Sequence, residues 1–125
     1  MTNSELLKAG RNRLLSLHKL LVDFERSVYE GMHGQVTSGQ FLNVLLEDPD
    51  FSWLRKFSTL IVDIDEMFAQ KDGFSEDAVT THLAKMRELV EMKIDDKDFV
   101  ARYRNVLQRD TDAGAEQGEL KMLLS

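Results

Sequence analysis

The sequence of 125 residues contains no cysteine and only one proline. The absence of cysteine excludes disulfide bonds, thiolate nucleophiles, zinc ribbons and cysteine-ligated iron–sulfur clusters. The longest apolar runs are only a few residues long, whereas a helix that spans a bilayer needs ~20 predominantly apolar residues. The first residues also lack the basic segment and apolar stretch of a secretory signal. We therefore expect a soluble, cytoplasmic protein.

A surplus of positive charge is also missing. Sixteen lysines and arginines face 22 aspartates and glutamates, so the formal net charge is −6. Proteins that bind nucleic acids usually present a concentrated basic face to the phosphates. The nearest approach to such a face is a group of four basic residues near the N-terminus: Lys8, Arg11, Arg13 and Lys19. We therefore predict neither a nucleic-acid partner nor a membrane partner.

Hydrophobic residues recur every three or four positions along most of the chain, which is the period of an amphipathic helix. The strongest example extends from Ser4, a candidate cap, to about Met32, where neighbouring glycines favour a helix end. The apolar stripe of this segment consists of Leu14, Leu17, Leu21, Phe24 and Val28. We predict that this long helix is central to the core.

Four shorter segments repeat the helical pattern. A helix through residues 41–46 should end before Pro49, because the residue that precedes a proline resists the helical conformation. Further helices are predicted over 50–68, 75–90 and 95–107. The length is typical of one domain. The sequence therefore predicts an all-α fold, a single-domain bundle of four to five helices.

The composition changes after Arg109. Residues 111–118 are small and polar and include two glycines, which is typical of a mobile linker. Residues 120–124 are mostly apolar and are expected to form either a short docking helix or a sticky tail. We therefore assign residues 1–109 to the helical bundle domain and residues 110–125 to a flexible linker with a short apolar C-terminal tail.

Known metal and cofactor motifs are incomplete in this sequence. Helical bundles can hold two metal ions through paired Glu-x-x-His motifs. Glu30 and His33 form one such pair, but the other two histidines have apolar residues at the required position. The acidic runs that begin at Asp63 and Asp110 lack the glycine and glutamate positions of an EF-hand loop. We predict no metal site, no cofactor and no catalytic residue.

Four polar residues on or beside apolar helix faces remain as candidate ligand-binding residues: His18, Glu25, Tyr29 and Asp65. On facing helices, His18 and Asp65 would form a general acid–base pair. The alternative is a hydrogen-bonded polar pair that fixes the register of the two helices. We favour the structural alternative, because no nucleophile or oxyanion donor accompanies these side chains.

Two stretches have a familiar pattern. The first is Leu14–Leu21, which is followed in the sequence by the pairs Glu25-Arg26 and Tyr29-Glu30. The second extends from Gln40 through Asp48-Pro49 to Glu66. Over roughly residues 12–68 the chain resembles a group of small, uncharacterised bacterial proteins. The resemblance implies a bacterial, cytosolic origin and a helical fold. It supplies no activity, cofactor or catalytic residue.

The sequence favours a non-enzymatic role as a protein-interaction or regulatory helical module. This interpretation is based on an acidic bundle without a recognisable site, followed by an apolar tail on a flexible tether. The expected partner is another protein or a second copy of the chain. The alternative is a small-ligand-binding protein or an enzyme that uses a polar cluster around His18 and Asp65.

Overall fold

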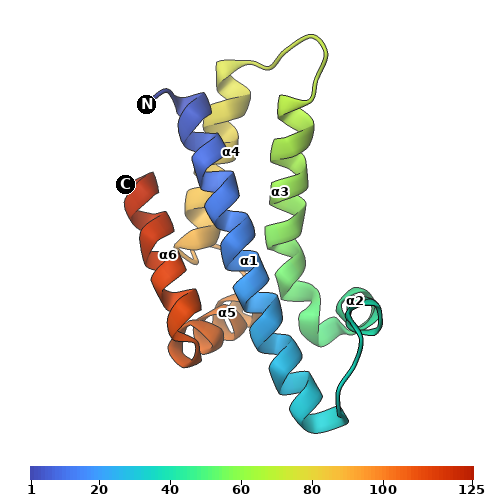
Figure 1. Cartoon of the computed structure of the whole chain (residues 1–125). Coiled ribbons are helices and arrows are strands. Elements are labelled where there is room, and N and C mark those ends of the chain that lie inside the picture. The colour runs from blue at the N-terminus through green and yellow to red at the C-terminus, as the bar shows by residue number, and fades with distance from the viewer.

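Helices account for nearly the whole chain in a computed structural model that describes residues 1–125 (Figure 1). The all-α prediction is confirmed, although the number of helices is higher than the four to five expected. The elements are α1 (Asn3–His33), α2 (Ser38–Glu47), the 3-10 helix η1 (Pro49–Leu54), α3 (Arg55–Phe68), α4 (Glu76–Val90), α5 (Lys97–Arg109) and α6 (Thr111–Leu124). None of the helices combines the length and the hydrophobicity that a membrane span needs.

Side-chain caps set the starts of most helices. Thr2, not the expected Ser4, caps α1, where its hydroxyl accepts a hydrogen bond from the Glu5 amide at 3.1 Å. The Glu5 carboxylate in turn accepts from the Thr2 amide at 3.3 Å, which completes a capping box. Thr37 and Gln40 repeat this arrangement at the start of α2.

The region after Pro49 differs from the single helix predicted over 50–68. Pro49 begins the 3-10 helix η1, and α3 follows from Arg55. The Asp48 carboxylate accepts a hydrogen bond from the Asp50 amide at 2.9 Å, so it caps this tight turn. The turn directs Phe51 and Trp53 into the interior, where they are 7% and 2% exposed.

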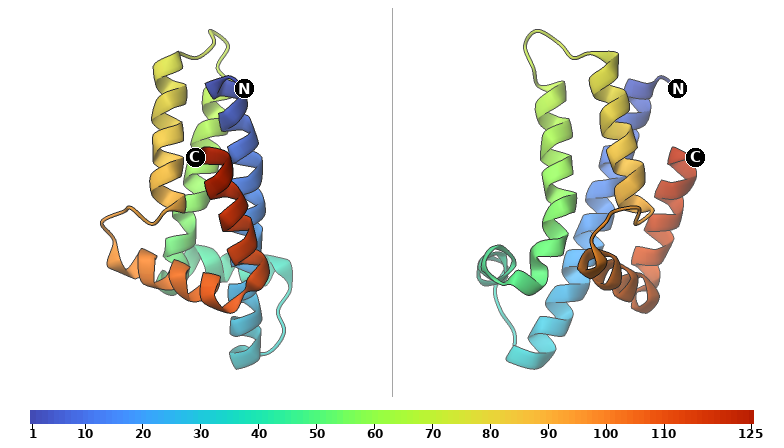
Figure 2. Two further views of the ribbon diagram at one scale, coloured as in Figure 1. Left: turned by 90° about the vertical axis from the view of Figure 1, so that its left-hand side faces the viewer. Right: turned by 180° about the vertical axis from the view of Figure 1, so that it is seen from behind.

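The long helix α1 organises the bundle, as its apolar stripe predicts. It packs against α3, α4 and α6, and it also contacts α5 and η1 (Figures 1 and 2). Four of its leucines are fully buried: Leu7, Leu14, Leu17 and Leu21. Helix α5 lies crosswise beneath α4 and α6, and the last turns of α1 extend past it (Figure 2).

The structure of the C-terminal segment differs from the prediction. Composition predicts a flexible linker and a tail over residues 110–125, but Thr111–Leu124 forms helix α6. Ala113 and Leu120 are fully buried, and Arg13 of α1 pairs with Glu116 at 3.2 Å. Glycine lowers intrinsic helix propensity by about 1 kcal/mol per residue. Burial of the apolar side chains against the bundle outweighs that local preference.

This packing makes α6 a determinant of stability. Leu120→Ala removes a fully buried side chain and should lower the free energy of unfolding by about 2–5 kcal/mol. Met122→Ala, on the same helix but 73% exposed, should change it by less than about 0.5 kcal/mol. Urea denaturation of both variants measures the difference. Equal stability of the two variants would show that α6 is not docked in solution.

Candidate functional site

The expected pairing between His18 and Asp65 is not formed. Asp65 instead receives two hydrogen bonds from the guanidinium of Arg11, at 2.9 Å from Nε and 2.8 Å from Nη2. This contact holds the pKa of Asp65 below its usual range, mainly through the hydrogen bonds. The His18 ring lies 6.3 Å from the Phe57 ring and makes no hydrogen bond. The two residues therefore form no acid–base pair.

The remaining candidates lie further along α1. Burial raises the pKa of the half-buried Glu25 carboxyl, while the positive charge of Arg102 opposes the shift. The Tyr29 ring packs against Phe41 of α2 and Phe51 of η1, with ring centroids 5.7 and 6.3 Å away. Tyr29 therefore anchors α2 and η1 to α1.

His18 and Asp65 line separate depressions, and neither Glu25 nor Tyr29 lines either of them. His18 lines a shallow depression on α1 with Leu15 and Val22. Asp65 lines a different depression, beside Lys8 and Phe68. The sequence pattern places these residues on apolar helix faces, but it does not determine which of their neighbours meet.

Glu30 and His33 also have structural contacts. The Glu30 carboxylate accepts a hydrogen bond from the Val36 amide at 2.9 Å, which ties the α1–α2 loop to α1. The His33 ring lies 4.4 Å from the Tyr29 ring. No group of three or more potential ligands (histidine, aspartate or glutamate) is close enough together to hold a metal ion.

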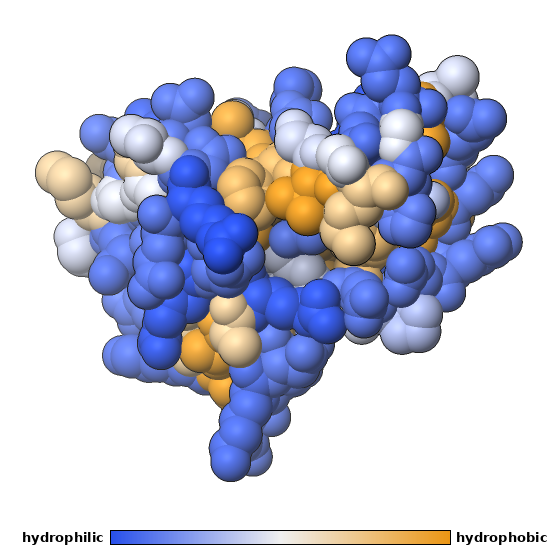
Figure 3. Space-filling view, turned by 90° about the horizontal axis from the view of Figure 1, so that it is seen from below, coloured by the Kyte–Doolittle hydropathy of each residue, from blue (hydrophilic) through white to orange (hydrophobic).

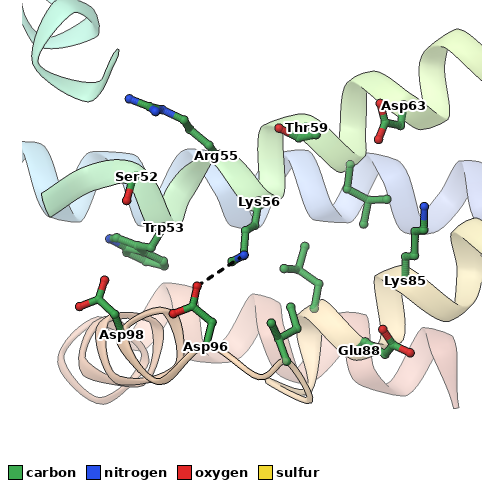
Figure 4. A pocket seen from close by; sticks show the side chains of 13 residues that line it. Ser52, Trp53, Arg55, Lys56, Thr59, Asp63, Lys85, Glu88, Asp96 and Asp98 are labelled. Carbon is green, nitrogen blue, oxygen red and sulfur yellow. Dashed lines mark ion pairs between the residues drawn. The ribbon is translucent and has the colours of Figure 1, made fainter. Parts of the chain in front are cut away.

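A groove of about 510 Å³ lies where the sequence pattern indicates no site. One wall comes from η1 and α3, and the other from α4, the α4–α5 connection and the start of α5 (Figure 4). Four hydrophobic residues line it: Trp53, Leu60, Leu89 and Ile94. Because its lining comes from several separate elements, no spacing within one segment of the sequence reveals the groove.

The charged residues of the groove mostly stabilise the fold. Lys56 pairs with Asp96 across the groove, with Nζ 3.5 Å from Oδ2 (Figure 4). Asp96 also caps α5, and its hydrogen bond from the Phe99 amide is the main cause of its lowered pKa. Asp98 at the same end is bound by Arg102 at 3.0 Å. The α5 end of the groove is therefore occupied by ion pairs and a helix cap.

The other end of the groove is open. Asp63 of α3 and Lys85 and Glu88 of α4 form no hydrogen bond and no ion pair there, and all three side chains are exposed (Figure 4). None of them is held against a second titratable group, so the arrangement provides no activated nucleophile or matched acid and base. The groove offers an apolar surface with a polar rim and no catalytic geometry.

Burial of His18 has a consequence for the pH dependence of stability. Desolvation lowers its pKa below the usual 6.5, so the unfolded chain takes up a proton more readily than the folded protein. His18 should therefore make folding stability decrease as the pH falls from about 7.5 to about 5, an effect that the raised pKa of Glu25 opposes. In His18→Gln this decrease should be smaller, as urea denaturation at the two pH values will show. Lys19→Gln, which alters an exposed neighbour, should leave the decrease unchanged.

Comparisons with known proteins provide no relative for this chain. No protein-family model, no curated protein and no solved structure matches it. The resemblance of residues 12–68 to small bacterial proteins therefore stays a prediction.

Proposed function

We propose that this protein is a non-enzymatic interaction module that binds another protein through the end of the molecule where α1 extends past the other helices. The main support is the change in exposure along the apolar stripe of α1. Within the bundle the stripe is fully buried at Leu17 and Leu21, whereas further along it Val28 and Met32 are 43% and 76% exposed. We call residues 28–33 of α1 the overhang.

The overhang continues the core stripe in register. Val28 follows Leu21 by seven positions, and Met32 follows Val28 by four, so the three side chains share one helix face. The helix ends at His33, beyond the part that α5 covers (Figure 2). Burying apolar surface is favourable by roughly 25 cal/mol per Å², so a partner that covers this face gains free energy.

Helix α2 adds a second pair of exposed apolar side chains near the same end. Leu42 and Leu46 are one turn apart and are 54% and 58% exposed, while Phe41 packs inward on Tyr29. Hydrophobic residues gather among hydrophilic ones on this end of the molecule (Figure 3). Grouped exposed apolar residues with polar surroundings are typical of protein-binding surfaces.

The alternative function, a ligand site or enzyme around His18 and Asp65, has less support. Its premise is a polar cluster around an internal cavity. Asp65 is instead held by Arg11 on the surface, and His18 lies in a separate depression. The interaction role needs no such cluster, because exposed apolar surface alone provides the driving force.

Photo-crosslinking tests the interaction role with a matched pair of positions. A photoreactive residue at position 32 should give a discrete crosslinked product in the native cells, whereas one at position 122 should not. Met32 and Met122 are 76% and 73% exposed, so simple exposure predicts equal labelling. The additional change Val28→Asp should remove the product without altering the unfolding midpoint.

Two outcomes would contradict the interaction role. One is labelling of equal intensity at both positions, and the other is the absence of any product at position 32. A product with twice the mass of the chain would identify a second copy as the partner.

A further inference from the structure

We infer that the partner presents an acidic amphipathic helix, whose apolar stripe covers the overhang and whose carboxylates face the basic outer side of α5. This inference rests on the proposed function and specifies the partner's chemistry. Helix α5 carries four basic residues and one aspartate, a formal charge of +3 in a chain whose net charge is −6.

Two of the basic residues of α5 belong to a helix face that points away from the core. Lys97, Ala101, Arg104 and Gln108 follow one another at intervals of four, three and four, so they share one helix face. All four are exposed, and no acidic residue belongs to this stripe. The opposite face holds Phe99, Tyr103 and Val106, which are fully buried. We call the exposed stripe the basic face of α5.

The two basic residues of this face, Lys97 and Arg104, have no partner within the chain. Most basic residues elsewhere contact a carboxylate, a carbonyl or an aromatic ring. Six make no ion pair, hydrogen bond or cation–π contact: Lys71, Lys85, Lys97, Arg104, Arg109 and Lys121. Three of the six lie on α5. Unpaired basic side chains in an acidic protein are available to an external acidic group.

The basic face and the overhang belong to the same end of the molecule. Helix α5 packs against α1 and lies crosswise to it just before the overhang begins (Figure 2). Arg102 of α5 acts electrostatically on Glu25, one turn before Val28. The view from below shows strongly hydrophilic residues beside the hydrophobic ones (Figure 3). A single partner helix can therefore contact both surfaces.

The geometry of a helix suits this combination. Lys97 and Arg104 are seven residues apart, which places them about 10 Å from each other along α5. Carboxylates two turns apart on a partner helix match that separation, and leucines at three-and-four spacing on its other side match Val28 and Met32. The chain's net negative charge opposes an acidic partner only weakly, because salt screens charges beyond about 8 Å.

Other occupants fit less well. A two-fold contact between copies through this end would bring two basic faces of α5 into one interface, where their like charges oppose each other. Nucleic acid would engage the three unpaired charges of α5 but would leave the apolar overhang exposed to water. Both remain distinguishable outcomes of the experiment below.

Synthetic peptides test the inference even though the partner is unidentified. The probes are two fluorescein-labelled amphipathic helices with the same leucine stripe, one with glutamates and one with lysines on the polar side. Fluorescence anisotropy should show the acidic peptide binding at least about tenfold more tightly than the basic one, because charge complementarity selects it. Added salt should weaken its binding.

Variants locate the binding on the protein. Lys97→Glu with Arg104→Glu should reverse the preference between the two peptides, whereas Lys71→Glu with Lys121→Glu, an equal change of charge elsewhere, should not. Met32→Asp should weaken both peptides, and Met122→Asp neither. Amide chemical shifts that move on α5 and the overhang, and unchanged unfolding midpoints, would support the assignment.

The possible failures separate the two proposals. If both peptides bind equally and Met32→Asp abolishes their binding, the overhang is a docking surface but the acidic partner is wrong. Tighter binding of a short DNA duplex, or dimerisation of the protein through this end, also overturns the acidic helix. If neither peptide binds, the inference fails, and the crosslinking at position 32 decides the interaction role on its own.

Discussion

Four leucines on one face of α1 have no exposed surface, and the other helices are arranged around them. Helices of 10 to 15 residues, as α2 to α6 are, are marginal in isolation, because most helical stability in proteins comes from tertiary packing. Each fully buried leucine contributes about 1.5–3 kcal/mol relative to an exposed one. The stripe of α1 is therefore the constraint on which α3, α4 and α6 depend.

The same stripe accounts for the proposed binding surface. The apolar face of α1 is covered by several helices inside the bundle and becomes exposed at Val28 and Met32, so stability and recognition use successive turns of one helix. Helix α5 marks the boundary between them, since its inner face closes the core with Phe99 and Tyr103 and its outer face carries unpaired basic residues. A short helix with two different faces can therefore serve both the fold and a partner.

The interior of the protein is apolar throughout. All 24 buried side chains are hydrophobic ones, with no charged or polar residue among them. The half-buried His18 and Glu25 lie at the edge of this core. Desolvation lowers the pKa of His18 and raises that of Glu25, so it favours the neutral form of each. Such groups make stability depend on pH. Neither is hydrogen bonded to a second titratable side chain.

Local patterns in the sequence determined the helical fold, the central place of α1 and most helix boundaries, since apolar period and capping act within a few residues. The same patterns failed at α6, where two glycines indicated a linker and only burial of Leu120 against distant residues reveals a helix. Tertiary structure alone decided that Asp65 meets Arg11, 54 positions away, and not His18. It also decided where the stripe of α1 stops being covered. The physical reason is that partners far apart in sequence are chosen by packing, which no local period specifies.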